Sequence, residues 1–534
     1  MGGGLRRPGA SILGVLVLSA MLVATPAGRR PFWSSDEARF ALLAQDVLDH
    51  GRWLVAEIRG RYYLNKPQLF FWAVAATALP FGRVTEASAA LPALVSSLCG
   101  VAGVIAVGRL VWGWQTGAVA GLILATTPLY FEMGHQVLPD GMLNAWLVWA
   151  LYWLLRAERA GWSLPPVLAF YGCVTAALLA KGPQALTALA AAAVALAFTD
   201  GFATLPKLRP VLGLALTFGV AAIVWLAPYH VRSAGAFDDH VLRGHYVTWY
   251  LLGPVLPRFT AFSAPLSAFL PWTLLLVAAP LWWRESPDPG RRRIALWTAT
   301  LWGLIAISGT YRSRYMLVVL PGLALVTAEF LTARVRGRAR RALDLASLAC
   351  AVLAVLVAGV MLSPLVRMVE NEDRAYVPDS RWEQAAIGAL ALAACAGLVR
   401  GVRLGAPLAG AVGLALAMAG ILLVEGVAYP IRYTRAFDVR PLTAAAAANV
   451  RPGGTVVGYP DLRLSYDFYL RRRVVEISDE ASVRTRLATA PDDAFIMTAE
   501  RWQALTAAAD PAWQVLASAT LRDKHMVVVG RAVR

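Results

Sequence analysis

The stretch Leu345-Ala-Ser-Leu-Ala-Cys-Ala-Val-Leu-Ala-Val-Leu-Val-Ala-Gly-Val-Met-Leu362 contains no charged residue, and Ala406–Val424 has the same character. A helical run of about 18–20 apolar residues matches the thickness of the hydrocarbon core of a bilayer. Neither run alternates between polar and apolar residues, as the strands of a membrane barrel do. The two segments therefore predict transmembrane helices.

The composition of the whole chain suits lipid as its main solvent. Hydrophobic residues make up 58% of the 534 residues and charged residues 16%, and the mean hydropathy is +0.56. We expect about thirteen spans, near residues 10–27, 87–109, 115–132, 139–156, 165–180, 182–199, 210–229, 265–283, 294–309, 315–333, 345–363, 383–400 and 406–428. The predicted fold class is an all-α polytopic membrane protein.

The formal net charge of +17 comes largely from short basic segments between the apolar runs. Basic loops mark the cytoplasmic side of a polytopic membrane protein. If the N-terminus is cytoplasmic, that side also receives the basic loops near residues 156–159, 207–209, 284–293, 334–341 and 400–403. Topology thus explains most of the excess charge, and nucleic acid is not expected as a partner.

The cysteines and the N-terminal segment do not change this interpretation. Cys99, Cys173, Cys350 and Cys395 lie in separate apolar runs without CxxC spacing, so neither a disulfide framework nor a metal site is predicted. The apolar run Ile12–Ala24 resembles a signal peptide, but its cleavage site is weak and many spans follow. We therefore expect a retained first helix.

The sequence predicts two domains, a transmembrane domain with two long outer loops and a small C-terminal domain. Residues 1–430 form the transmembrane domain, with outer loops at 31–82 and 230–264. Residues 431–534 have the composition of a small α/β domain, and short strands are expected at 456–459, 474–477, 494–498 and 526–529, with helices near 442–449 and 499–509. An odd number of spans puts this domain on the face opposite the N-terminus, the periplasmic face of a bacterial inner membrane.

The first outer loop begins with Ser34-Ser35-Asp36-Glu37-Ala38-Arg39-Phe40. Ser34 and Glu37 have the spacing of a capping box, and Phe40 begins an apolar stripe, so the segment predicts a short amphipathic helix on the membrane surface. Asp36 and Glu37 could simply complement the positive end of this helix. Alternatively, a carboxylate at the surface could act as a general base toward an acceptor hydroxyl. The pattern alone leaves both interpretations open.

The same loop continues with Arg61-Tyr62-Tyr63-Leu64-Asn65-Lys66-Pro67-Gln68 and an aromatic segment. With the Asp36-Glu37 pair about thirty residues earlier, this motif resembles the ArnT and protein O-mannosyltransferase (PMT) superfamily of membrane glycosyltransferases. Gln68 stands where that family usually has a second proline. The resemblance implies a GT-C fold with juxtamembrane helices after the first span.

The resemblance also implies roles for these residues. Asp36 would be the catalytic base, and Glu37 would position or assist it. Arg39, Lys66 and Tyr63 would bind the phosphate of a lipid-linked donor, and Asn65 is a further site candidate. Fixed cations at a poorly hydrated interface would stabilise the departing phosphate. For Lys66 and Arg39 the alternative is snorkelling toward lipid headgroups.

Weaker matches follow within the spans. Asp140 lies in a segment that resembles the part of the family near the donor site, although it could serve only as a helix N-terminal charge. Lys181, in Ala180-Lys181-Gly182-Pro183, resembles the family's Thr-Lys-Gly break between two helices. A charge at membrane depth suggests function, unless Lys181 lies on a loop tip that faces solvent.

Two further segments carry candidate phosphate-binding residues. The segment with His240 and Arg243 resembles a family segment that has a histidine near the phosphate. His240 is a candidate ligand for a divalent metal ion, although Asn65 stands where the family has a nearby glutamate. Tyr311, Arg312 and Arg314 match a motif before a late span. The two arginines lie on the predicted outer face, where anion binding competes with snorkelling as their explanation.

The resemblance implies an inverting glycosyltransferase that takes a sugar from a polyprenyl (undecaprenyl) phosphate and gives it to a periplasmic acceptor. Lipid A or lipopolysaccharide, another glycan and protein all remain open as acceptors. No cofactor is expected except a divalent metal ion at most. A lipid or polysaccharide transporter is the rival class, but such proteins often contain inverted repeats, and no matching halves are visible.

Overall fold

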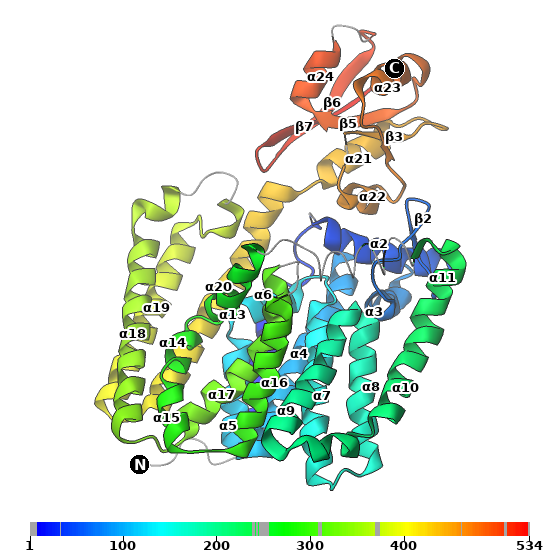
Figure 1. Ribbon diagram of the computed structural model, residues 1–534. Coiled ribbons are helices and arrows are strands. Elements are labelled where there is room, and N and C mark those ends of the chain that lie inside the picture. The colour runs from blue at the N-terminus through cyan, green and yellow to red at the C-terminus, as the bar shows by residue number, and fades with distance from the viewer. Residues whose placement is uncertain are drawn as a thin grey trace.

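The computed structural model describes residues 8–32, 34–237, 241, 244, 256–307, 312–368, 374–460, 462–506 and 510–531. Figure 1 shows long helices standing side by side, with the N-terminus at the lower end of the bundle and a small α/β domain beyond its upper end. His240, Arg243 and Tyr311 lie outside the described residues. The predicted fold class, a helical membrane protein with a C-terminal α/β domain, is confirmed.

The bundle is built from helices at nearly all predicted spans. They are α1 (Pro8–Ala24), α4 (Glu86–Trp112), α5 (Trp114–Ala125), α6 (Pro128–His135), α7 (Asp140–Arg159), α8 (Leu164–Lys181), α9 (Thr187–Asp200), α10 (Pro210–Ala221), α11 (Ala227–Ser233), α13 (Leu256–Ala268), α14 (Trp272–Leu276), α15 (Ala279–Glu285), α16 (Pro289–Ala306), α17 (Leu320–Thr332), α18 (Gly337–Leu362), α19 (Arg381–Arg403) and α20 (Pro407–Phe437).

Not every one of the thirteen predicted spans is a long, uninterrupted apolar helix. Within the described residues, eight helical stretches are long and apolar enough to cross a membrane, or nine if a pair bent by 110° is one span. Helices α1 and α5 are shorter, α5 and α6 divide one predicted span, and α7 and α16 carry charged residues inside their helical bounds. The predicted spans are apolar runs in the sequence. Helix breaks and charged helix ends make the uninterrupted apolar helix shorter than such a run.

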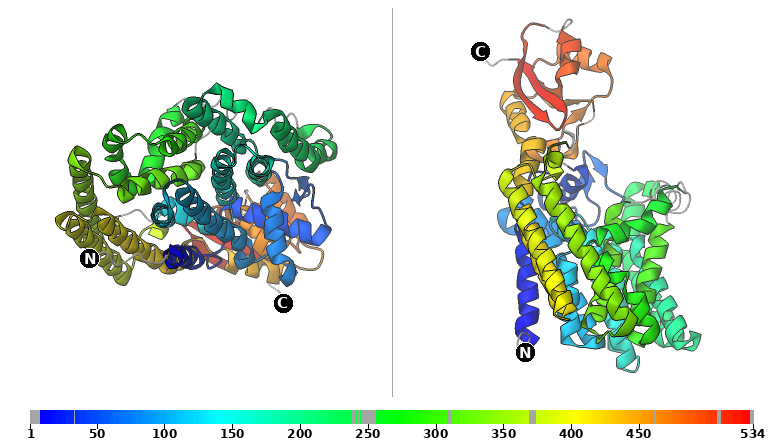
Figure 2. Two further views of the ribbon diagram at one scale, coloured as in Figure 1. Left: turned by 90° about the horizontal axis from the view of Figure 1, so that it is seen from below. Right: turned by 90° about the vertical axis from the view of Figure 1, so that its left-hand side faces the viewer.

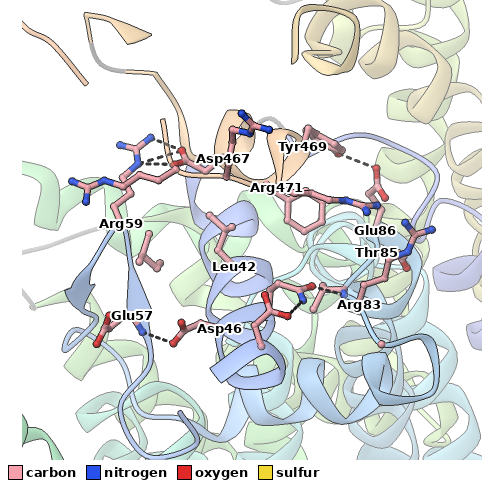
Figure 3. A pocket seen from close by; sticks show the side chains of 18 of the residues that line it. Leu42, Asp46, Glu57, Arg59, Arg83, Thr85, Glu86, Asp467, Tyr469 and Arg471 are labelled. Atoms are coloured by element: carbon pink, nitrogen blue, oxygen red, sulfur yellow. Dashed lines mark hydrogen bonds and ion pairs between the residues drawn. The ribbon is translucent and has the colours of Figure 1, made fainter. Parts of the chain in front are cut away.

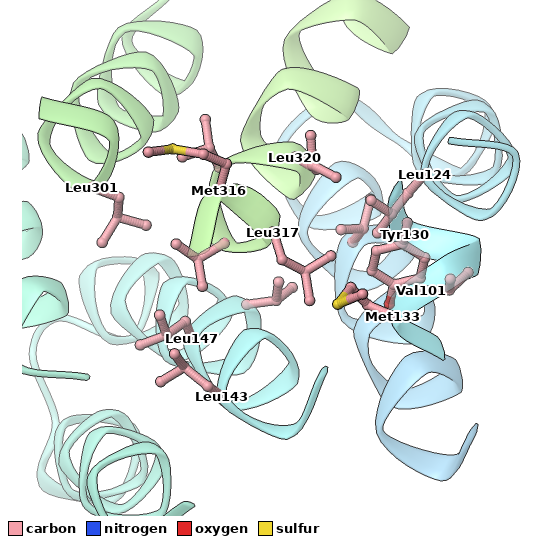
Figure 4. Packing of buried hydrophobic residues seen from close by; sticks show 14 of the residues in the cluster. Val101, Leu124, Tyr130, Met133, Leu143, Leu147, Leu301, Met316, Leu317 and Leu320 are labelled. Atoms are coloured by element: carbon pink, nitrogen blue, oxygen red, sulfur yellow. The ribbon is translucent and has the colours of Figure 1, made fainter. Parts of the chain in front are cut away.

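Small residues and buried apolar side chains hold the helices together. A side chain on Gly108 of α4 would come within 2.6 Å of Gly117 Cα in α5, so these two backbones approach closely. Figure 4 shows the interior that helices α4 to α7, α16 and the 3₁₀ segment η6 (Ser313–Val319) share. Its buried side chains include Val101, Leu124, Tyr130, Met133, Leu143, Leu147, Leu301, Met316, Leu317 and Leu320.

The first outer loop forms a layer across the upper end of the bundle, beneath the C-terminal domain (Figure 1). It contains α2 (Ser35–His50), the strands β1 (Glu57–Ile58) and β2 (Arg61–Tyr62), α3 (Leu69–Ala78) and the turn η1 (Leu79–Phe81). The predicted apolar stripe of α2 is buried, and Phe40 packs edge-on against Phe70 of α3 at 5.3 Å between ring centroids. This packing fixes the rotation of α2 and the direction of its polar side chains.

Of the predicted capping box of α2, the Ser34 cap is present, but Glu37 does not bond back to the start of the helix. Ser34 caps the helix by accepting a hydrogen bond from the Asp36 N–H at 3.2 Å. The Glu37 carboxylate, however, binds Arg30 and the Val137 N–H. A nearby buried guanidinium offers this carboxylate a stronger partner than the N-cap backbone amide does.

The C-terminal domain is a five-stranded mixed sheet with helices. Its elements are α21 (Arg440–Asn449), β3 (Val456–Tyr459), α22 (Leu464–Leu470), β4 (Val475–Glu476), α23 (Glu480–Thr489), β5 (Ala494–Thr498), α24 (Ala499–Thr506), β6 (Trp513–Leu521) and β7 (Lys524–Arg531). The strand order is β4-β3-β5-β7-β6, with β3 parallel to β4 and β5, and β7 antiparallel to both of its neighbours. The four predicted strands are present, whereas β6 was not predicted. Helix α22 contacts α2 of the first outer loop, and Figure 2 shows the C-terminal domain beyond that loop, which is drawn in blue.

Candidate active site

Asp36 lies in the first turn of α2, where its carboxylate faces away from the buried apolar side of the helix. Three guanidinium groups converge on it. Arg39 Nη1 lies 2.6 Å from Oδ1, while Arg314 Nη2 and Arg312 Nη1 lie 2.9 Å and 3.2 Å from Oδ2. Arg39 is one helical turn further along α2, whereas the two other arginines precede or begin η6, far away in the sequence. The structure thus brings three predicted cations onto the predicted base.

A second carboxylate lies beside this cluster. Lys181 Nζ at the end of α8 lies 2.7 Å from Asp140 Oδ1 at the start of α7, and Arg314 Nε lies 4.0 Å from the same oxygen. Arg314 therefore bridges Asp36 and Asp140. Lys181 is 5% exposed and also lies 4.2 Å above the Tyr315 ring, so it does not occupy a loop tip that faces solvent.

Lys66 belongs to the same charged region. Its ammonium group interacts electrostatically with Lys181, Asp140, Arg314 and Asp36, and its backbone carbonyl accepts a hydrogen bond from the Tyr229 hydroxyl at 2.9 Å. Burial, followed by repulsion from Lys181, lowers the pKa of Lys66 to about 8. A lysine that only snorkelled toward headgroups would lie away from these charges.

Tyr63 and Asn65 border the cluster on the outer loop. The Tyr63 ring lies 5.9 Å from the Arg39 guanidinium carbon, and its hydroxyl also bonds to Arg39. Burial raises the pKa of Tyr63 to about 12, so the hydroxyl stays protonated at neutral pH. Asn65 is exposed next to Lys66.

The charges of this cluster do not balance. Burial raises the pKa of Asp36, but the hydrogen bond from Arg314 and the positive charges of Arg314, Arg39 and Arg312 outweigh burial and lower it below its ordinary value. Two carboxylates, Asp36 and Asp140, face five basic side chains, namely Arg39, Lys66, Lys181, Arg312 and Arg314. The excess of three positive charges is suited to a phosphate.

Glu37 lies next to Asp36 in the chain but binds different groups. Arg30 donates two hydrogen bonds to its carboxylate, at 2.7 and 2.8 Å, and the Val137 N–H donates a third at 3.1 Å. Both side chains are almost fully buried, and the Arg30 guanidinium also lies 4.7 Å above the Tyr433 ring. Glu37 therefore ties α2 to the segment before α7 and to α20. Arg30 was not predicted from the sequence, because it belongs to no recognisable motif.

Gln68, which replaces a proline of the family motif, connects the first outer loop to the helix bundle through hydrogen bonds. Its Nε2 donates hydrogen bonds to the Leu54 carbonyl at 2.7 Å and to the Val224 carbonyl at 2.8 Å, and the side chain is fully buried. Val224 lies in the π-helical turn Ala222–Leu226 between α10 and α11. A proline cannot form these two bonds, so the substitution replaces backbone rigidity with a tertiary contact.

The outer loop and the C-terminal domain also enclose a cavity of about 690 Å³ (Figure 3). Arg59 crosses between the two parts and bonds to Asp467 at 2.5 Å and to Glu476. Asp46 and Arg471 are among the residues that line the cavity, whereas Asp36 and Lys66 are not. The cavity therefore adjoins the predicted site along α2 but does not contain it.

The structure offers no metal site within the residues that it describes. No group of three or more histidine, cysteine, aspartate or glutamate side chains there could hold a metal ion. The candidate metal ligand His240 is outside the described part, as are Arg243 and Tyr311. These three assignments stay predictions.

Comparisons with known proteins show which family and which fold this chain resembles. Residues 65–226 match a family model described as dolichyl-phosphate-mannose-protein mannosyltransferase (PMT_2), which covers Lys66, Asp140 and Lys181. The undecaprenyl phosphate-alpha-4-amino-4-deoxy-L-arabinose arabinosyl transferase of Pectobacterium carotovorum is 26% identical over 60% of this chain and 58% of its own length. The corresponding transferase 1 of Sodalis glossinidius is 25% identical over 71% of this chain and 69% of its own. Several of the matches, the first among them, thus span less than two thirds of the relative.

The structural comparison covers almost the entire chain. The crystal structure of ArnT from Cupriavidus metallidurans bound to undecaprenyl phosphate matches with a TM-score of 0.76 over 97% of this chain and 98% of that protein, at 18% sequence identity. At this identity the likeness establishes the fold. The chain is therefore similar to the PMT_2 family over residues 65–226 and to ArnT over most of its length, and it has the GT-C fold of ArnT, that of a multi-pass membrane protein.

Proposed function

We propose that the chain is a glycosyltransferase that moves a sugar from a polyprenyl phosphate to an acceptor at the outer face of the membrane. The observation that carries this proposal is the convergence of five basic side chains on Asp36 and Asp140 at one end of the bundle. The relatives' names supply the donor class, undecaprenyl phosphate. The bacterial inner membrane is the proposed location, with the site and the C-terminal domain on the periplasmic face.

The charge excess supports phosphate as the leaving group. A sugar joined to a polyprenyl phosphate is a diester with one negative charge, and the bond cleavage releases a monoester that carries a second negative charge. Fixed cations therefore stabilise the transition state more than the bound donor, which is the condition for a faster chemical step. Arg312, Arg314 and Lys66 are proposed for this role because they lie around Asp36, and Arg39 and Tyr63 are proposed to assist them.

Asp36 is proposed as the general base. A donor phosphate competes with its carboxylate for Arg312 and Arg314, which leaves the carboxylate able to accept a proton. The acceptor oxygen then forms a bond to the anomeric carbon while the bond from that carbon to the phosphate oxygen breaks, and the acceptor proton passes to Asp36. A single displacement of this kind inverts the configuration at the anomeric carbon.

Asp140 and Lys181 are proposed to hold Arg314 in place, because Arg314 lies against both carboxylates. Glu37 is proposed to position α2, since its carboxylate is fully engaged by Arg30 and the Val137 N–H. His240, Arg243 and Tyr311 remain proposed phosphate contacts on the family motif alone. The acceptor is proposed to be lipid A or lipopolysaccharide, or another glycan, with protein as the alternative.

The direct test is transfer by the purified full-length protein in detergent or nanodiscs. A panel of polyprenyl-phosphate sugars is combined with lipid A, glycan and peptide acceptors, beginning with undecaprenyl-phosphate aminoarabinose because that donor occurs in the relatives' names. Each reaction is run once with Mg²⁺ and once with EDTA. The pair of reactions tests whether transfer needs a divalent metal ion, for which His240 is the candidate ligand. We expect product with at least one pair and inversion at the anomeric carbon.

Asp36→Asn should abolish this transfer. Asp49→Asn is the matched control, because Asp49 lies on the same helix and bonds only to Gln45 among the described residues. Full activity of Asp36→Asn would remove Asp36 from the mechanism. Movement of lipid or glycan across proteoliposome membranes without any sugar transfer would support a transporter instead.

A further inference from the structure

A hollow lies between α1, α4 and α7 at the end of the bundle where the chain begins, opposite the proposed active site. Its volume is about 540 Å³. Arg109, at the end of α4, and Arg156 and Arg159, at the end of α7, line it together with Tyr152. Ile12 and Leu16 of α1 are among the apolar residues of its wall. No acidic residue lines it.

The spacing of these residues puts them on facing helix surfaces. Tyr152, Arg156 and Arg159 are four and three residues apart, so they form one stripe along α7. On α4, Ala102 and Arg109 lie two helical turns apart on one face, about 10 Å along the helix axis. The hollow is therefore apolar toward the middle of the membrane and strongly basic toward its surface.

The three arginines have no side-chain partner within the part of the chain that the structure describes. The acidic side chain closest in sequence, Glu158, binds Arg293 instead. Each arginine could complement the negative end of its own helix. That effect acts on each helix separately, however, and does not explain why three guanidiniums and a tyrosine border one hollow with an apolar wall.

The hollow lies at the periphery of the bundle. Leu13 and Val17, on the side of α1 next to Ile12 and Leu16, are 62% and 49% exposed, so the described part of the chain leaves this side of α1 uncovered. Figure 2 shows α1 at the edge of the bundle in the view from below. An acyl chain can therefore enter the hollow from the bilayer while its headgroup stays level with the arginines.

We propose that this hollow binds an anionic glycerophospholipid of the leaflet on the N-terminal side, which is the cytoplasmic leaflet by the distribution of basic loops. The three guanidiniums bind the phosphate of the lipid, the Tyr152 hydroxyl donates a further hydrogen bond, and one acyl chain lies against Ile12, Leu16 and Ala102. This site is separate from the proposed donor site, and its test needs no transfer assay.

The test is native mass spectrometry of the full chain in detergent, titrated with phosphatidylglycerol, cardiolipin or phosphatidylethanolamine. We expect anionic lipid to remain bound at concentrations about tenfold lower than phosphatidylethanolamine. The triple variant Arg109→Gln, Arg156→Gln, Arg159→Gln should lose this preference. The matched control is Arg336→Gln, Arg338→Gln, Arg341→Gln, which removes the same charge from another basic segment beside the same membrane face.

A second variant tests the apolar wall without a change of charge. Ala102→Trp fills the hollow and should lower the retention of anionic lipid while the three arginines remain. Soluble glycerol phosphate should compete poorly, because it lacks the acyl chain. Unchanged lipid preference in the triple variant, an equal loss in the control, or equally tight binding of glycerol phosphate would each overturn the proposal.

Discussion

Asp36 and Glu37 are neighbours in the chain, but their side chains face two different regions of the molecule. Asp36 faces a partly exposed region in which positive charges outnumber carboxylates, whereas Glu37 faces a buried region in which its charge is matched by Arg30. A balanced buried pair has little capacity for a further ion, while an unbalanced cluster can bind one. A charge surplus, more than the number of charged residues, therefore distinguishes a candidate active site from a structural contact.

The change with the greatest predicted effect on sugar transfer is the replacement of the Asp36 carboxylate. Asp36→Asn should lower the turnover number for sugar transfer by about 10²–10⁴-fold, the range of general base catalysis. Its melting temperature should stay close to that of the parent, because Asp36 is partly exposed and its arginines can reach solvent. Kinetics and thermal unfolding in the same detergent measure both quantities. A large loss of stability would show that Asp36 is structural as well.

Glu37→Gln should produce the opposite result, mainly a loss of stability. Removal of one partner leaves the buried Arg30 charge unpaired, which costs about 3–5 kcal/mol. The measurement is thermal or denaturant unfolding of the purified protein. The double variant Arg30→Gln, Glu37→Gln should recover a substantial part of this loss, since no unpaired charge remains. If the double variant is as unstable as the sum of the single variants, the pair is not coupled.

Arg314 tests the bridge between the two carboxylates of the cluster. Arg314→Gln should lower the turnover number by about 10²–10³-fold, as the removal of one preorganised cation does, and Arg314→Lys should restore only part of it because one ammonium cannot reach both carboxylates. Arg340→Gln is the control, since Arg340 pairs only with Asp344 among the described carboxylates. Equal activity of Arg314→Gln and the parent would exclude Arg314 from phosphate binding.

The smallest of these effects is a pH dependence of sugar transfer, which Lys66 causes as one of the five basic side chains around Asp36 and Asp140. With a pKa of about 8, Lys66 is charged below that pH and loses its proton as the pH rises through it. Transfer at low donor concentration should therefore decline above pH 8, by up to about tenfold per pH unit if the charged form is required. Lys66→Arg should move this decline to higher pH, because a guanidinium keeps its charge. A profile that does not change in Lys66→Arg would assign the decline to another group.

Part of the candidate site could be predicted because motifs are local. Asp36, Arg39 and Lys66 lie in one loop, and a capped helix with a buried stripe orients the first two together. Arg30 could not be predicted, since its partner depends on how α2 packs against the segment before α7. The capping box failed for the same reason. An apolar run also does not reveal where a helix breaks, as between α5 and α6, so fewer uninterrupted apolar helices than predicted spans are found among the described residues.

Local hydrophobic patterns in the sequence were enough to predict the membrane class, most of the bundle helices and four of the five strands of the C-terminal sheet, because helix and strand formation and burial follow such patterns. The tertiary structure alone decided that Arg312 and Arg314 meet Asp36, that Lys181 meets Asp140, and that Glu37 turns away to Arg30. These contacts join residues up to 278 positions apart. Coulomb attraction acts over distances in space, so only the packing of the helices could select which charges meet.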